Sequence, residues 1–243
     1  MSINVGAHTH AGALFGASSV TSGAITTQAT GSTFFIGVGV YSSANTITIA
    51  DNKSNSFPQV GTNASFAPDN QLQLAIFLCV NGSGGAGHTF TANLSPNSAV
   101  GLWVVEITGG ALSGILDQNP AANSSTTDPY TSSVTGTLSQ PNELLISQTL
   151  TYTSADGEVL NWGNSFTPLD AEGHGSDSVT GGTAYRIVSS ATTYQSSFSA
   201  SGGVTSGALT GIYSFKELGA GLISRTTQMS SRNALGSRSI LAA

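Results

Sequence analysis

The chain has 243 residues, of which only 7% are charged, against ~25% in an average soluble domain. Its formal net charge of −6 disfavours nucleic-acid binding, and no apolar run approaches the ~18–20 residues that cross a bilayer. We therefore expect neither a nucleic acid nor a membrane as partner. The charge is unevenly placed: all acidic side chains lie within residues 1–218, whereas residues 219–243 carry three arginines and no carboxylate.

Short blocks rich in β-branched and aromatic residues alternate with turn residues along the chain, a pattern typical of sandwiches and barrels. The first set of predicted strands is Ile25–Gln28, Phe34–Tyr41, Thr46–Ala50, Leu72–Val80, His88–Leu94 and Gly101–Thr108. The second set is Ser133–Leu138, Glu143–Tyr152, Gly182–Ser189, Tyr194–Ala200 and Leu209–Glu217. The polar residues 109–130 between the two sets are predicted to form a long linker.

The two sets resemble each other in order and spacing. Asn52–Phe57 corresponds to Asn161–Phe166, and Gly101–Glu106 corresponds to Gly211–Lys216. A duplication would make each set an antiparallel unit with too little core to stand alone, so that the two units pack face to face. Chance similarity in a chain rich in serine and threonine is the alternative.

We therefore predict an all-β fold, an antiparallel jelly-roll-like β-sandwich over residues 18–218, with halves at about 18–108 and 131–218. Residues 1–17 and 219–243 are predicted to be extended N-terminal and C-terminal arms. Both ends carry aliphatic side chains that purely disordered tails seldom have. The candidate partner-binding residues of the basic C-terminal arm are Arg225, Arg232, Arg238, Leu222, Ile240 and Leu241. A frayed end or a short helix over Leu222–Leu235 are the alternatives for this arm.

Five blocks carry a resemblance to known proteins: Asp51–Phe57, Leu72–Val80, Gly87–Thr91, Trp103–Ile107 and, opening the second half, Asn142–Ile146. They resemble β-sandwich modules of bacteriophage virion proteins and of bacterial surface or secreted proteins. The resemblance leaves out both ends of the chain. These are sheet and turn patterns, which specify architecture and hardly any activity. The resemblance therefore implies a non-enzymatic structural or attachment module.

Searches for catalytic and metal-binding patterns return few candidates. The nucleophile elbow, the phosphate-binding loop and the Cys-x-x-Cys motif are all missing from the sequence, and we predict no enzyme and no cofactor. His8 and His10 would point to the same side of an extended segment, and three such pairs around a trimer axis would offer six nitrogens to a metal. We favour two solvated histidines instead. His174 follows Asp170 and Glu172, but chain proximity alone does not orient a catalytic base.

Glycan binding requires an exposed aromatic platform. Trp162, in a predicted turn, is the best candidate, and Tyr152 is a second one. The alternative for Trp162 is that it folds back to cap the core. Trp103 lies within an alternating strand and is predicted to be core, and the single cysteine, Cys79, is predicted to be a buried free thiol.

These observations lead to one functional expectation and one alternative. We expect a bacteriophage virion structural protein, either a head decoration or minor capsid protein or a tail component, that assembles as a homo-oligomer such as a trimer. Its partners would be copies of itself and a major capsid or tail protein. The N-terminus lacks the pattern of a signal peptide, which suits assembly in the host cytoplasm and a final location in the virion. The alternative is an extracellular glycan-binding or adhesion module.

Overall fold

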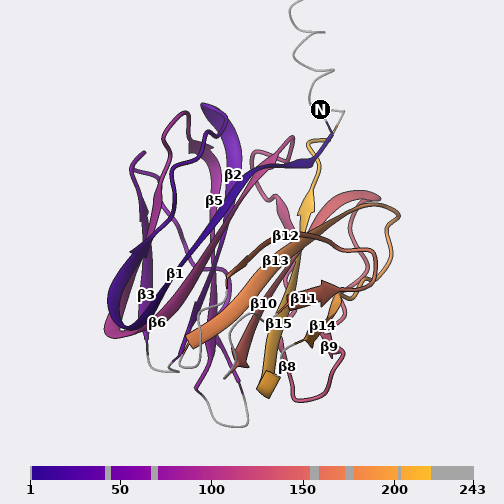
Figure 1. Ribbon diagram of the computed structural model, residues 1–243. Coiled ribbons are helices and arrows are strands. Elements are labelled where there is room, and N and C mark those ends of the chain that lie inside the picture. Colours follow the sequence, from indigo (N-terminus) through magenta and orange to yellow (C-terminus); the bar gives the residue numbers. More distant parts are fainter. Residues whose placement is uncertain are drawn as a thin grey trace, which may run out of the picture.

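The computed structural model describes residues 2–41, 45–66, 71–153, 159–172, 178–201 and 204–219. Every regular element in these ranges is a β-strand, and every strand pairing is antiparallel. The predicted all-β antiparallel fold is therefore confirmed. The strands form two bodies that lie side by side, one indigo to magenta and one pink through orange to yellow in Figure 1.

The first body is built from the first six strands of the chain. They are β1 (Asn4–Thr21), β2 (Thr30–Val40), β3 (Thr46–Asp51), β4 (Ala64–Ser65), β5 (Gln73–Ser83) and β6 (Phe90–Thr108). The strand order in the sheet is β1-β6-β2-β5-β4, and β3 pairs with the first part of β6. The long strand β6 has two partners on this side: its first part pairs with β3, and its second part pairs with β2.

The second body contains two sheets. Its larger sheet consists of β7 (Leu116–Gln118), β8 (Asn123–Ser125), β10 (Asn142–Thr153), β12 (Thr167–Glu172), β13 (Ser178–Ser189) and β15 (Val204–Lys216). The strand order is β12-β13-β10-β15-β7, with β8 also paired to β15. Its smaller sheet, in the order β11-β14-β9, consists of β9 (Tyr130–Thr131), β11 (Val159–Trp162) and β14 (Ser197–Ser201).

The largest core lies between the two bodies. Phe35 and Trp103 of the first body share one buried cluster with Leu144, Ile146 and Phe215 of the second. The ring centroids of Phe35 and Phe215 lie 5.9 Å apart with near-perpendicular planes, a favoured arrangement of aromatic pairs. The halves therefore pack face to face, as the sequence predicts for a β-sandwich, and Trp103 is fully buried as expected.

Each half also has a core of its own on its outer face. Strand β2 reads as an apolar run, so its alternate side chains bury both faces: Phe35 points into the central core, whereas Phe34, Ile36 and Val38 belong to a second cluster. In the second half, Leu145 and Ile212 belong to a corresponding outer cluster that also contains Phe166. Each half thus adds a core to the shared central one, because an apolar run buries two faces and recruits a further layer; that neither half stands alone stays a prediction.

The two halves repeat the same order of pairing. The first sheet has the order β1-β6-β2-β5-β4, and the second, written from its other edge, has the order β7-β15-β10-β13-β12. The central strands β2 and β10 correspond, and so do the strands on either side of them. The hydrogen bonds repeat too: the Ser22 N–H donates to the Phe90 carbonyl as the Ser132 N–H does to the Ser196 carbonyl, and each serine hydroxyl accepts the partner's N–H. This is the pattern that a duplication predicts; the duplication and the jelly-roll topology stay predictions.

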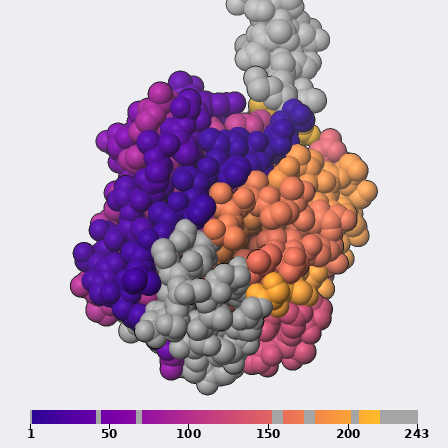
Figure 2. Space-filling view, in the orientation of Figure 1, coloured from indigo at the N-terminus to yellow at the C-terminus, as the bar shows by residue number. Residues whose placement is uncertain are grey.

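The N-terminal arm expected over residues 1–17 is corrected by the structure. From Asn4 onward this segment is strand β1, which pairs along β6 from Asn4 opposite Thr108 to Thr21 opposite Thr91. The physical reason is that its alternating small and apolar residues extend the sheet, while Ile3 inserts into the central core. Figure 2 shows β1 in indigo running across one face, beside the orange segment of the second half.

The predicted linker is likewise part of the fold. Residues 116–118 and 123–125 are strands β7 and β8, and both pair with β15. The connection therefore extends the second sheet instead of passing over it.

Candidate functional site

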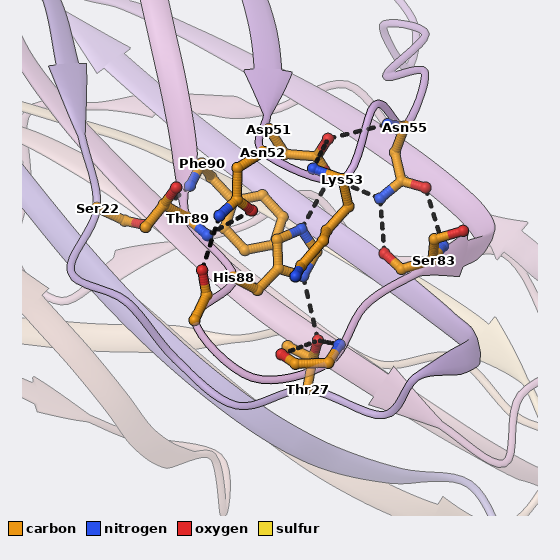
Figure 3. A network of polar contacts seen from close by, with 12 residues as sticks. Ser22, Thr27, Asp51, Asn52, Lys53, Asn55, Ser83, His88, Thr89 and Phe90 are labelled. Carbon is orange, nitrogen blue, oxygen red and sulfur yellow. Dashed lines mark hydrogen bonds and ion pairs between the residues drawn. The ribbon is translucent and has the colours of Figure 1, made fainter.

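The most connected polar cluster lies in the first half and centres on His88 (Figure 3). Its Nε2 lies 2.8 Å from Oδ2 of Asp51, and its Nδ1 lies 3.1 Å from Oγ1 of Thr27. Asp51 ends β3, Thr27 precedes β2, and His88 precedes β6. Three connections far apart in the sequence therefore meet at one imidazole.

Packing fixes the orientation of this ring. His88 stacks on Phe90 with centroids 4.1 Å apart, and Phe34 meets it edge-on at 5.0 Å. A backbone bridge between His88 and Ile25 holds the chain on either side. The imidazole is thus confined by two aromatic rings and by its own backbone.

Side chains bind both nitrogens of the imidazole. Oγ1 of Thr27 accepts the N–H of Gly85 at 3.0 Å, and it lies 3.1 Å from Nδ1 of His88 and 3.5 Å from the Gly85 carbonyl. Because the Asp51 carboxylate only accepts hydrogen bonds, Nε2 of His88 donates to it. Burial alone would raise the pKa of Asp51, but hydrogen bonds from Asn55, His88 and Lys53 outweigh it and hold the pKa below its ordinary value of 3.8.

This order of carboxylate, imidazole and hydroxyl resembles that of hydrolytic triads. The chemistry requires that a substrate reach the hydroxyl, however, and both His88 and Thr27 are buried. The Thr27 oxygen also already accepts a backbone N–H. We therefore interpret the His88 cluster as a structural clamp that fixes three loops at the outer end of the first half.

A second buried carboxylate ties β1 to the body. Glu106 on β6 accepts the N–H of Ala7 at 2.9 Å and that of Gln28 at 2.7 Å, and it also accepts the hydroxyl of Ser32. Gly6 makes room for it, since a Cβ there would overlap the carboxylate. The charge of Glu106 is thus used within the fold.

The second half contains a buried pair of acidic groups. Glu143 on β10 is fully buried, and neither of its oxygens accepts a hydrogen bond from the described residues. Burial, together with the negative charge of Asp117, raises the pKa of Glu143 to about 7. Asp117 accepts the N–H of Ser139 at 2.8 Å and faces the Lys216 ammonium at 3.8 Å. Glu143 is therefore the group of this pair that holds a proton near neutrality.

The two histidines proposed for a metal meet one carboxylate instead. Nδ1 of His8 lies 2.6 Å from Oδ2 of Asp170, and Nδ1 of His10 lies 3.3 Å from its Oδ1. Because Asp170 is on β12, these contacts join the edges of the two halves. No group of three or more His, Cys, Asp or Glu residues suited to a metal occurs in the described part of the chain.

The structure places the glycan candidates as follows. Trp162 ends β11 and is partly buried, with its ring 5.4 Å from that of Phe198. It caps a core, which is the alternative that the sequence left open. Tyr152 lies on β10, but its side chain is outside the described residues. The proposed partner-binding residues Arg225, Arg232, Arg238, Leu222, Ile240 and Leu241 all lie outside the described residues too.

Exposed apolar side chains gather at a bulge of β1. Leu14 is 58% exposed and Phe15 49% exposed, between the register positions Ala13 and Ala17. The ring of Phe15 meets that of Tyr41 edge-on at 5.0 Å. A backbone φ of +92° at Gly16 shapes the bulge. We call Leu14, Phe15 and Gly16 the β1 tip.

The sequence alone does not reveal the polar cluster of His88, Asp51 and Thr27. Asp51 and His88 both lie in blocks that the resemblance singles out, but their 37-residue separation gives no local signal of contact. Glu143 likewise sits at the start of a predicted strand, where a solvated acid is expected. Only its isolation in an apolar block hints at burial.

Comparison with known proteins finds no matching family model, curated protein or solved structure. The part of the chain that the structure describes contains no helix with the length and apolarity of a membrane span.

Proposed function

We propose that this chain is a structural protein of a bacteriophage particle, a head decoration, minor capsid or tail component, that assembles with copies of itself. The observation that carries the proposal is strand β1. It lies at the edge of its sheet and, over 18 residues, contains neither a charged residue nor a proline. Proteins that stay monomeric usually protect long edges with charges, proline or short strands.

The course of β1 locates the open part of this edge. Its first half lies beside β12 through the contacts of His8 and His10 with Asp170. Beyond them the strand continues to Thr21 and carries the β1 tip, with two large apolar side chains exposed to solvent. An uncharged edge with an apolar tip suits pairing with another subunit.

Charge supports assembly through like copies. Residues 1–218 carry all 12 acidic side chains and only three basic ones, so the bodies of two copies repel each other unless positive charge intervenes. The three arginines of residues 219–243 would pair with carboxylates of a neighbouring subunit or of a major capsid or tail protein. The virion setting rests on the resemblance of the sheet and turn blocks, with assembly in the host cytoplasm before incorporation.

The internal polar clusters support a role without catalysis. His88 and Glu106 are buried, as is the side chain of Asp51, and their hydrogen bonds join segments of the first half. The adhesion alternative relies on Trp162 as an exposed platform, whereas Trp162 is partly buried and packs against Phe198, which favours the structural role.

The test is the mass of the native assembly. Sedimentation velocity of the full chain should show a discrete oligomer, and a single 24.4 kDa species across the micromolar range would contradict assembly. For the virion setting, mass spectrometry of purified particles of the phage that encodes the chain should find it in stoichiometric amounts. Its absence from complete particles would overturn that setting.

A further inference from the structure

A cleft of about 340 Å³ lies between the two halves, away from the β1 tip and the His88 cluster. One side is formed by residues 60–65, between β3 and β5, and the other by residues 119–122, between β7 and β8. Leu74, Ile76 and Tyr213 also line it, and since all three side chains are buried, they form its floor. Small-molecule sites have volumes of ~300–1,000 Å³, so the cleft has room for one small ligand.

The described lining of the cleft carries no charge. All of the described residues that line it are uncharged, and burial raises the pKa of the Tyr213 hydroxyl, which keeps it neutral. Anions and cations would therefore lose hydration there without gaining a partner. This excludes phosphates, nucleotides and basic peptides as preferred ligands, and with no carboxylate in the lining the cleft also lacks the acid pair of a glycosidase.

Neutral hydrogen-bonding groups line both sides. Asn63 and Thr62 stand on one side and Asn119 on the other. Oδ1 of Asn63 accepts a hydrogen bond of 2.6 Å from Nε2 of Gln59, so this amide is oriented and keeps its own N–H groups as donors. Amides and hydroxyls above an apolar floor match a ligand with hydroxyl groups around its edge and C–H groups on its face.

We propose that this cleft binds a neutral sugar unit, with Asn63 and Asn119 holding its hydroxyls and the floor of Leu74, Ile76 and Tyr213 contacting its C–H face. The cleft is distinct from the surface around Trp162, which does not line it. It is formed by both halves of one chain, so binding does not depend on assembly.

Saturation-transfer NMR on the full chain tests this site with three methyl glycosides, of glucose, galactose and N-acetylglucosamine, at millimolar concentration. We expect transfer to the ring C–H protons of at least one sugar. Ala121→Trp fills the cleft and should abolish the transfer, whereas Ala24→Trp, at another exposed alanine outside the cleft lining, should leave it unchanged. Asn119→Leu should weaken the transfer without affecting thermal unfolding.

Three outcomes would overturn the proposal. They are no transfer to any of the three sugars, transfer that persists in Ala121→Trp, and preferential binding of the anionic methyl glucuronide. Equal loss in Ala121→Trp and Ala24→Trp would place the binding elsewhere and also count against this cleft. A monomeric chain that binds the sugar would contradict assembly alone, so the two proposals can fail separately.

Discussion

Nε2 of His88 and Oδ2 of Asp51 lie 2.8 Å apart, and both side chains are 0% exposed. The pair closes the outer end of the first half, because each residue also binds a loop: His88 contacts Thr27, and Asp51 accepts the N–H groups of Lys53 and Asn55. A satisfied buried network of this kind confers stability that depends on every member.

Removing Asp51 should therefore destabilise the protein strongly. Asp51→Ala leaves the buried His88 N–H and the part-buried N–H groups of Lys53 and Asn55 without their acceptor, and each unsatisfied buried donor costs about 1–3 kcal/mol. Urea denaturation measures the free energy of unfolding. The neighbouring Lys53→Ala removes only a hydrogen bond to the Ala86 carbonyl and serves as control. If both variants lost the same small amount, the clamp interpretation would be wrong.

The lowered pKa of Asp51 predicts that the stability of the protein falls in acid. This pKa in the folded protein is below 3.8, so Asp51 contributes stability that is present above pH 3.8 and is lost as the pH falls through the lower, folded value. Asp51→Ala should remove this part of the acid sensitivity. Thermal unfolding at pH 5 and pH 2.5 for parent and variant gives the comparison, with a smaller drop expected in the variant.

Glu143 predicts the opposite trend near neutrality. Its pKa is about 7 in the folded protein against 4.5 ordinarily, so the folded state keeps a proton that the unfolded state has lost. Stability should fall as the pH rises from 4.5 to 7 and stay reduced above, by at most about 3 kcal/mol. Glu143→Gln stays neutral and should be more stable than the parent at pH 8 and nearly equal at pH 4.5. A pH-independent difference would contradict the prediction.

Replacing Glu106 by glutamine should destabilise the contact between β1 and the rest of the first half. In Glu106→Gln an NH₂ group replaces one acceptor oxygen and faces the N–H of Ala7 or Gln28, so a donor meets a donor. Lost hydrogen bonds to a charged acceptor cost about 1.5–3 kcal/mol each. Hydrogen exchange should show faster exchange of the Ala7 and Gln28 amides. Glu217→Gln, on a partly exposed acid, is the control, and unchanged exchange in Glu106→Gln would exclude the proposed tether.

Local pattern predicted the strands well and the polar clusters poorly. Trp103 and the run Leu72–Cys79 are core because alternation and apolar runs report burial directly. His88 and Asp51 form a pair only because β3 and β6 meet in space, which no local pattern records. The sequence predicts an arm over residues 1–17 because small residues mask the alternation of β1. The packing of Trp162 on Phe198 depends on the smaller sheet β11-β14-β9, whose strand pairing no local pattern records.

The β1 tip gives a direct test of assembly. Phe15→Lys places a charge on the exposed part of the edge strand, where pairing with a second strand would have to bury it. We expect a shift from oligomer to monomer in sedimentation velocity with the thermal unfolding temperature nearly unchanged. Val134→Lys is the matched control, since Val134 is similarly exposed at 53% but lies in the second half. Equal effects of the two lysines would exclude a specific role for β1.

Residues 220–243 give the last test. A chain ending at Gly219 retains every described contact of the fold, so it should unfold as cooperatively as the parent. If the basic segment pairs with a neighbouring subunit, the shortened chain should sediment as a monomer or bind its capsid or tail partner more weakly. Replacing Arg225, Arg232 and Arg238 by glutamine separates charge from apolar anchoring: salt-sensitive assembly should disappear in this variant if charge pairing dominates. Unchanged assembly of the shortened chain would assign oligomerisation to β1 alone.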